Sequence, residues 1–272
     1  MASTRRQFLG QATAFSAAAL AGNALAAPGP AFLLGSQSYS FRKFDTIGVI
    51  SEVKKLGLSA IEFCGVHFPC DPAHAGLAEV KQLIADAGIV VPCYGVESFT
   101  ADEAANRAKF EFAKAMGIGI LTADPLPESF DSLDKLTEEY KIKIAIHNHG
   151  PNDMRYGKVQ MVLDAIQDHS PMIGACVDTG HSIRSGEKPH EVLAALGDRV
   201  ISLHLKDWTH GGEEQILGDG DMDLTAVAKV LKDINFGGPL MIEYENSPEN
   251  PGPDMAVGMV NWQKAVDAVW TA

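Results

Sequence analysis

The stretch that decides the fold is KIAIHNHG, residues 143–150. Side chains on a strand alternate between its two faces. The two isoleucines of this stretch therefore share one face, while His147 and His149 share the other. The pattern predicts a strand that buries an apolar face and presents two imidazoles near its C-terminal end.

Three later segments repeat this arrangement. Each has apolar residues at every second position and a metal-capable side chain on the other face, close to its C-terminal end. They are IGACVD (173–178), which ends in Asp178, ISLHLK (201–206), which carries His204 and Lys206, and LMIEYE (240–245), which carries Glu243 and Glu245.

The chain between residue 32 and its end alternates short apolar runs with helical patterns. A first strand is expected at 32–40 and a first helix at 47–56, followed by Gly57, a residue typical of a helix C-terminus. The alternation continues to a last helix at 255–270, which makes eight strand-then-helix units. Such units predict a parallel sheet closed on itself, an α/β fold of the (β/α)8 TIM barrel type in a single domain. An open doubly wound sheet is the structural alternative.

The first 26 residues have the features of an export signal. Arg5 and Arg6 precede a weakly apolar run and a small-residue cleavage site, ALAA at 24–27. The run is too polar and too short to span a membrane. We therefore expect a twin-arginine (Tat) signal peptide at 1–26, a linker at 27–31 and the barrel at 32–272, in a periplasmic or secreted protein.

The composition excludes several kinds of partner. Lys and Arg number 22 against 35 Asp and Glu, and the formal net charge is −13 at pH 7. An acidic surface repels phosphate backbones and anionic lipids, so neither nucleic acid nor stable membrane association is expected. The four cysteines form no CxxC motif, and buried free thiols are the default. A Cys64–Cys70 disulfide formed after export stays an open alternative.

Polar residues expected at the C-terminal ends of the strands form the candidate site, because barrel enzymes keep their chemistry at that end. A single His or Asp at a strand end is more often a satisfied structural group, but four consecutive strands of matching parity favour a site. Mixed nitrogen and oxygen ligands suit a divalent ion such as Mn, Zn, Co or Mg. The candidates are Glu62, Glu97, His147, His149, Asp178, His181, His204, Lys206, Glu243 and Glu245.

The order and spacing of these motifs resemble the xylose-isomerase-like TIM barrels, a family of sugar phosphate isomerases and epimerases related to inosose dehydratase, tagatose-type epimerases and endonuclease IV. The resemblance covers essentially the whole mature chain, and its family-specific pieces are IHNH (146–149), VDTGH (177–181), LHLKD (203–207) and IEYE (242–245). The family's single-metal site takes Glu, Asp, His and Glu from strands five to eight. The resemblance therefore implies one divalent metal ion bound by Asp178, His204 and Glu243.

The strand-five position departs from the family pattern, because His147 stands where the family has Glu. We expect His147 to bind the metal instead, although a metal-bound neutral imidazole cannot serve as the carboxylate base. The resemblance implies that epimerases of the family move one proton with two Glu ligands on opposite faces of the sugar, and here only Glu243 remains. His149, whose ordinary pKa lies near neutrality, fits the role of the missing base. His181 is expected to hydrogen-bond a ligand or to bind metal itself, with a helix-start hydrogen bond as an equal alternative.

The remaining candidates are expected to contact the substrate. Lys206 is expected to stabilise a developing oxyanion, and an ion pair with Asp207 or Glu245 is the alternative. Trp208 and Tyr39 are suited to stack on a sugar face, although plain packing is the commoner role of such residues. The expected substrate-binding residues are Glu62, Glu97, Trp208 and Glu245.

These residues predict a metal-dependent sugar isomerase or epimerase, which transfers a proton next to the substrate carbonyl through a metal-stabilised enediolate. Export favours an unphosphorylated sugar or keto-sugar as the small-molecule partner, since sugar phosphates are cytoplasmic metabolites. A lyase or dehydratase that eliminates a β-substituent from the same intermediate, with His149 as base, is the close alternative. A non-catalytic sugar-binding barrel is a further alternative, the net charge argues against a nuclease, and a homo-oligomer is left open.

Overall fold

The computed structural model describes residues 29–271, so the expected signal peptide at 1–26 lies outside the described residues. The strands are β1 (Leu33–Gln37), β2 (Ile61–Glu62), β3 (Cys93–Phe99), β4 (Ile120–Pro125), β5 (Lys143–His147), β6 (Ile173–Asp178), β7 (Val200–Leu205), β8 (Asp207–Trp208), β9 (Glu214–Gln215) and β10 (Pro239–Ile242). The α-helices are α1 (Thr46–Lys55), α2 (Leu77–Ala87), α3 (Glu103–Met116), α4 (Phe130–Tyr140), α5 (Val159–Ile166), α6 (Thr179–Arg184), α7 (Pro189–Leu196), α8 (Leu224–Asp233) and α9 (Gly252–Trp270). Three short 3-10 helices are η1 (Ser38–Phe41), η2 (Pro127–Ser129) and η3 (Gly197–Arg199).

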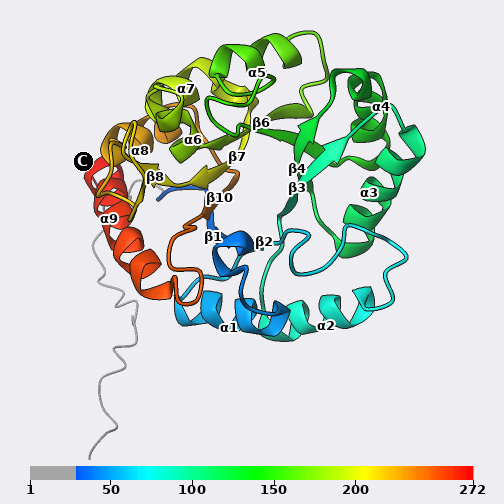
Figure 1. The fold of residues 1–272 in the computed structure, drawn as a ribbon, viewed down its shortest axis with the longest axis horizontal. Helices are drawn as coiled ribbons and strands as arrows, with labels where there is room; N and C mark the ends of the chain where they lie inside the picture. Colours follow the sequence, from blue (N-terminus) through cyan, green and yellow to red (C-terminus); the bar gives the residue numbers. More distant parts are fainter. Residues whose placement is uncertain (1–28, 272) are drawn as a thin grey trace, which may run out of the picture.

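Eight of the strands form one parallel sheet, in the order β2-β1-β10-β7-β6-β5-β4-β3. Parallel bridges from Ala60 to Val90 and from Phe63 to Tyr94 join the two ends of this order. The sheet therefore closes into a barrel, and the helices surround it (Figure 1). The expected (β/α)8 barrel is confirmed. No helix within residues 29–271 combines the length and the apolar character that a membrane span needs.

The helices begin and end where their sequences supply caps. Asp102 accepts a hydrogen bond from the backbone N–H of Ala105 at the start of α3, and Asp223 does the same for Ala226 at the start of α8. Helix α3 ends at Gly117, whose φ of 80° is the left-handed conformation that glycine adopts without strain. The apolar faces of the helices then pack on the outward-facing side chains of the strands to form the main core.

The inside of the barrel is filled in layers. Small and apolar side chains such as Ala145, Cys176 and Ile201 pack against one another below the site. Two residues further along, β5 and β6 present His147 and Asp178, and the register of β6 with β7 pairs Asp178 with His204. Parallel pairing therefore brings the metal-capable ends of successive strands to one level.

A short helix and a hairpin were not expected from the sequence. Helix α6 begins directly after β6, because the Asp178 side chain accepts a hydrogen bond from the backbone N–H of His181. Strands β8 and β9 form an antiparallel hairpin above the barrel. The four cysteines are free thiols, and Cys64 is buried while Cys70 is half-buried.

Candidate active site

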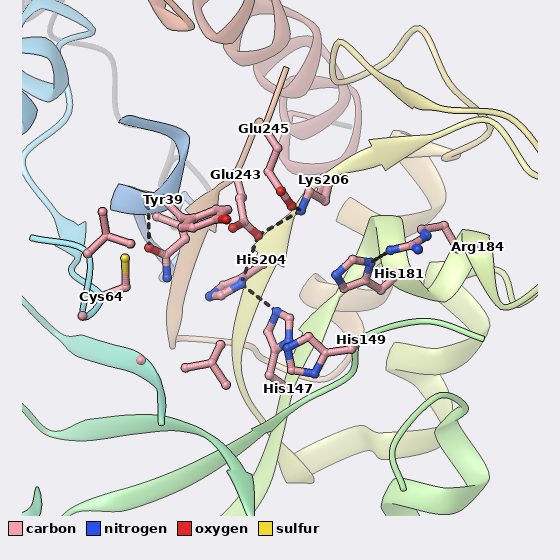
Figure 2. Close-up of a pocket in the computed structure, with 15 residues that line it drawn as sticks. Tyr39, Cys64, His147, His149, His181, Arg184, His204, Lys206, Glu243 and Glu245 are labelled. Atoms are coloured by element: carbon pink, nitrogen blue, oxygen red, sulfur yellow. Dashed lines mark hydrogen bonds and ion pairs between the residues drawn. The ribbon is translucent and has the colours of Figure 1, made fainter. Parts of the chain in front are cut away.

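Four buried side chains converge at the C-terminal end of the barrel: His147 from β5, Asp178 from β6, His204 from β7 and Glu243 directly after β10. Each offers one ligand atom, and these atoms all lie within 4.8 Å of one another. His147 Nε2 lies 3.0 Å from His204 Nδ1, which lies 3.4 Å from Glu243 Oε2 (Figure 2). The structure therefore brings together the four residues that were expected as ligands, which we call the four-residue cluster.

The cluster has the character of a cation site. Asp178 Oδ2 is buried and has no hydrogen-bond partner, and it lies 3.6 Å from His147 Nε2. A buried carboxylate oxygen without a partner is unfavourable, and a cation among these side chains would satisfy it. Two imidazole nitrogens and two carboxylate oxygens are a donor set that divalent ions such as Zn and Mn accept. The residues present thus fit a divalent metal ion.

Glu62 lies directly behind the cluster, on β2. Its Oε2 is 3.0 Å from His204 Nε2, and the Cys93 thiol donates to the same oxygen at 3.1 Å. Burial by itself raises the pKa of Glu62, but His204 together with the neighbouring Thr122 and Cys93 side chains outweighs burial and holds the pKa below its ordinary value. An ionised Glu62 accepts the proton of His204 Nε2, which directs Nδ1 toward the other three members. Burial alone lowers the pKa of His204, but Cys176, Glu62 and Glu243 outweigh burial and raise it, so a metal ion would displace a proton from Nδ1. Glu62 is fully buried and does not line the pocket, which assigns it to His204 instead of to the substrate.

Glu62→Gln is expected to weaken metal binding by roughly 10- to 100-fold, the usual effect of changing a group that orients a metal-bound histidine. The amide keeps the shape of the side chain but removes the charge that fixes His204. Glu97→Gln is the matched control, because Glu97 forms an ion pair with Lys109 at 2.7 Å and does not line the pocket. Titration of metal-free protein with Zn or Mn measures both affinities. Equal affinities in the two variants would assign Glu62 no part in holding His204.

Lys206 is a buried cation among carboxylates. Its Nζ lies 3.3 Å from Glu243 Oε2 and 3.8 Å from Asp178 Oδ2, and it also forms an ion pair with Glu245. Burial alone lowers the pKa of this amine, but the carboxylates of Glu243, Asp178 and Glu245 outweigh burial and raise it. Lys206 is therefore a permanent positive charge, suited to stabilise negative charge and unsuited to act as a base. Of the two expected alternative partners, Glu245 is confirmed.

Asp207, the other expected partner of Lys206, has a separate task. It accepts hydrogen bonds from the backbone N–H groups of Gly218, Gly220 and Met222 at 2.8–3.1 Å. The residue therefore fastens the loop that precedes α8. The close approach depends on glycine, since a side-chain carbon at Gly220 would lie 2.3 Å from Asp207 Oδ1.

Two further histidines border the cluster. The His149 ring lies 4.6 Å from that of His147, and burial, helped by the nearby His147, lowers the pKa of His149 to about 4. His181 Nε2 lies 4.0 Å from Asp178 Oδ2, and burial lowers the pKa of His181 to about 3. Both imidazoles are therefore neutral at pH 7. The helix-start role considered for His181 is filled by its backbone N–H, which leaves its ring facing the pocket.

A pocket of about 640 Å³ lies over the cluster, a volume typical of small-molecule sites. Glu245 lines it, as expected of a substrate-binding residue, whereas Glu97 and Trp208 do not. The Trp208 indole instead lies beneath the Arg184 guanidinium, 4.8 Å away, and donates from Nε1 to the Gly212 carbonyl at 3.1 Å. The residues that line the pocket are Gln37, Tyr39, Cys64, Gly65, Val66, Gly95, Val96, His147, His149, His181, Arg184, His204, Lys206, Glu243 and Glu245.

Sequence reasoning missed several of these lining residues. Gln37 and Cys64 come from the ends of the first two strand units, and Arg184 comes from α6. The available signal for Arg184 was the spacing of Asp178 and His181, which is typical of a helix N-cap followed by a first turn. A helix that begins after Asp178 places Arg184, three positions after His181, on the same side of the helix as His181.

The β8–β9 hairpin supports the far side of the pocket through Glu214. Its carboxylate accepts hydrogen bonds from the backbone N–H groups of Glu245 and Asn246, at 2.9–3.0 Å. Burial raises the pKa of Glu214 to about 7, although Lys206 acts in the opposite direction. The folded protein therefore holds a proton on Glu214 more tightly than the unfolded chain does.

Glu214→Gln is expected to remove a pH dependence of stability. With the folded pKa at about 7 and the unfolded value at 4.5, the contribution of Glu214 is complete below pH 4.5 and is lost as the pH rises through 7. Relative to the variant, the wild type should lose on the order of 2 kcal/mol of unfolding free energy between pH 5 and 8. Urea denaturation in the presence of chelator measures it, with Glu213→Gln as an exposed neighbouring control. Parallel curves for wild type and Glu214→Gln would contradict the expectation.

Residues 50–266 match the family model described as "Xylose isomerase-like TIM barrel". The chain belongs to this family. The resemblance deduced from the motifs is thereby confirmed.

Curated relatives match part of the chain. An inosose dehydratase from Clostridium perfringens is 29% identical over 147 residues, covering 47% of this chain and 49% of its own. A 3-oxo-isoapionate decarboxylase from Pectobacterium atrosepticum is 30% identical over 104 residues, covering 35% of this chain and 36% of its own. The chain spans 49% of the length of the dehydratase and 36% of the length of the decarboxylase.

Solved structures match over nearly the whole barrel. An uncharacterized protein from Parabacteroides distasonis is 27% identical with a TM-score of 0.67, covering 86% of this chain and 98% of that one. A D-tagatose 3-epimerase-like protein is 17% identical with a TM-score of 0.71, covering 88% and 98%. D-psicose 3-epimerase from Clostridium cellulolyticum is 12% identical with a TM-score of 0.70, covering 86% and 99%. The likeness to the two epimerases is one of fold.

Proposed function

We propose that this chain is a divalent-metal-dependent lyase or dehydratase, which removes a proton next to the carbonyl of an unphosphorylated keto-sugar and eliminates a β-substituent. The observation that carries the choice is the make-up of the pocket. Glu243 and Glu245 are the carboxylates that line it, and Glu245 is paired with Lys206. With His147 in the cluster, Glu243 is the one cluster carboxylate that lines the pocket in the described part of the chain, so this part offers no symmetric pair of carboxylate bases.

His149 supplies the base in this proposal. It is neutral at pH 7, and its side chain is 42% exposed on the pocket. A base with a pKa of about 4 removes a proton only from an acidified C–H, and a divalent ion held by the four-residue cluster would acidify it by polarising the carbonyl. Protonated His149 is then a strong acid, well matched to return the proton to the departing oxygen.

Lys206 assists by charge alone. It is positive at the working pH and lies beside Glu243, so it stabilises negative charge that develops on a substrate oxygen above the cluster. Its burial excludes water from the ammonium and strengthens that interaction. Elimination needs a base, an acid and a fixed positive charge. His149 serves first as the base and then as the acid, and Lys206 is the fixed positive charge.

Isomerisation or epimerisation is the second candidate. Return of the proton to a neighbouring carbon gives isomerisation, and return to the opposite face gives epimerisation. Glu243 follows β10 and His149 follows β5, and both line the pocket, so a proton can reach the substrate from two directions.

The test measures bound metal and products together. Elemental analysis of the purified protein should give about one divalent ion per chain, removable with chelator. The loaded protein should convert a 3-keto-glucoside in D2O into an ultraviolet-absorbing enone with release of the β-substituent. Deuterium uptake at carbon without release would assign isomerisation or epimerisation instead. Absence of any ion after Mn, Zn and Co addition would overturn the enzyme proposal and leave a sugar-binding barrel.

We also infer that the protein is exported by the Tat route. Arg5 and Arg6 before an apolar run and a small-residue cleavage site support this, as stated from the sequence. Cell fractionation tests it: the wild type should be periplasmic or secreted, and a variant with both arginines changed to lysine should stay in the cytoplasm. An unchanged distribution would overturn the inference.

A further inference from the structure

Arg184, at the C-terminal end of α6, lines the pocket without a carboxylate partner. Within residues 29–271, the guanidinium makes one hydrogen bond, from Nη1 to His181 Nδ1 at 2.8 Å, and stacks on the Trp208 ring at 4.8 Å. Lys206, the other permanent cation of the lining, has three carboxylates within 4.0 Å. In so acidic a chain, a pocket-lining arginine left without an acidic partner is a charge available to a ligand.

The guanidinium is held in place before any ligand arrives. His181 fixes one end, the indole of Trp208 supports one face, and Gly150 lies nearby. A side-chain carbon at Gly150 would lie 3.5 Å from Arg184 Cζ, and the φ of 91° at this position favours glycine. A pre-positioned guanidinium loses little conformational entropy on binding, which raises the affinity for a group that matches its planar fork.

Arg184 also lies within reach of a sugar bound at the cluster. His181 spans the gap, since its Nδ1 accepts from Arg184 and its Nε2 lies 4.0 Å from Asp178 Oδ2. The guanidinium is therefore one imidazole ring away from the four-residue cluster. Figure 2 shows Arg184 and His181 on one side of the cluster and Tyr39 on the other. A ligand centred over the cluster is thus flanked by a cation on one side and an aromatic ring on the other.

We propose that Arg184 binds a carboxylate group of the substrate, so that the substrate is an acidic sugar of the uronate or aldonate type. This deepens the proposed function and rests on it. A guanidinium pairs with a carboxylate through two parallel N–H···O bonds, and one arginine suffices. A phosphate is commonly met by several cationic or backbone donors, and among residues 29–271 Arg184 is the single uncommitted cation of the lining. On the opposite side, the partly exposed ring of Tyr39 suits the C–H face of the sugar.

The experiment compares two sugars that differ at one carbon. D-glucuronate and D-glucose, with D-glucose 6-phosphate as a third ligand, are titrated calorimetrically into metal-loaded and metal-free protein. The wild type should bind glucuronate at least about tenfold more tightly, in line with a charge-assisted hydrogen-bonded pair. Arg184→Gln should bring the two affinities within about twofold while metal content stays unchanged. Lys188→Gln, which removes the same charge from an exposed position, should keep the full preference.

Three results would overturn the proposal. They are equal affinities in the wild type, a preference that survives in Arg184→Gln, and tighter binding of glucose 6-phosphate than of glucuronate. The metal-free titration separates this outcome from failure of the proposed function. If the protein binds no metal but still prefers glucuronate through Arg184, the proposed lyase function is wrong and the carboxylate-binding role of Arg184 is supported.

Discussion

Asp178→Asn is expected to abolish metal binding and, with it, turnover. Asp178 Oδ2 is a buried cluster oxygen without a hydrogen-bond partner. The substitution turns the charged carboxylate into a neutral amide. Oδ1 accepts from the backbone N–H of His181 at 2.7 Å, and asparagine keeps an oxygen for this helix cap. The fold should therefore survive. The loss of affinity should exceed the roughly 100-fold produced by changes one step further from a metal.

Metal per chain and the rise in melting temperature on adding Zn or Mn measure this effect. The wild type should bind about one ion and gain stability from it, since a ligand that binds only the folded state stabilises it. Asp178→Asn should show neither. The matched control is Asp223→Asn, which makes the same change at the N-cap of α8 outside the site. Wild-type metal content in Asp178→Asn would remove Asp178 from the ligand set and discredit the cluster.

His149→Ala is expected to keep the metal and lower kcat by roughly 10²- to 10⁴-fold, the usual contribution of a general base. The His149 ring borders the cluster without belonging to it, and its nearest carboxylate is that of Asp153, at 3.9 Å. Its removal should therefore disturb neither the metal nor the fold. His169→Ala is the control, because His169 pairs with Asp134 at 2.8 Å outside the pocket.

The pH profile gives an independent check of the base. Protonation inactivates a base, so wild-type kcat should fall as the pH falls through about 4 and stay level toward neutrality. The residual activity of His149→Ala should lack that dependence. Because acid also protonates metal ligands, metal content has to be followed at each pH. Full activity in His149→Ala with metal bound would remove this residue from the mechanism and leave Glu243 as the base.

The position of His147 separates this chain from the family pattern that its sequence resembles. A histidine at the end of β5 still provides a metal-binding nitrogen, as its Nε2 lies 3.0 Å from His204 Nδ1. It does not provide a second carboxylate that can exchange a proton with the sugar. The change therefore leaves the cluster complete while altering the chemistry that it can support, which is why elimination is preferred here to a symmetric epimerisation.

The sequence by itself determined the barrel and the four-residue cluster. Alternating apolar residues specify which strand face is buried, and parallel pairing then aligns the ends of neighbouring strands. The side chains that lie one level above the last buried layer must therefore meet, and His147, Asp178, His204 and Glu243 do so. Periodicity and closure of the sheet bring these strand ends together, and the resemblance to the xylose-isomerase-like barrels singled out Asp178, His204 and Glu243 as ligands, with His147 expected at the remaining position.

Only the tertiary structure decided what surrounds the cluster. Glu62 and Glu97 have the same chemistry and both lie on strands, yet one is buried behind His204 and the other pairs with Lys109. Arg184 reaches the pocket because Asp178 caps an unforeseen helix, and Trp208 supports it instead of touching substrate. Such placements depend on helix caps, hairpins and contacts between residues distant in sequence. A strand pattern has a period of two and carries no information about them, so they became apparent only when the chain was folded.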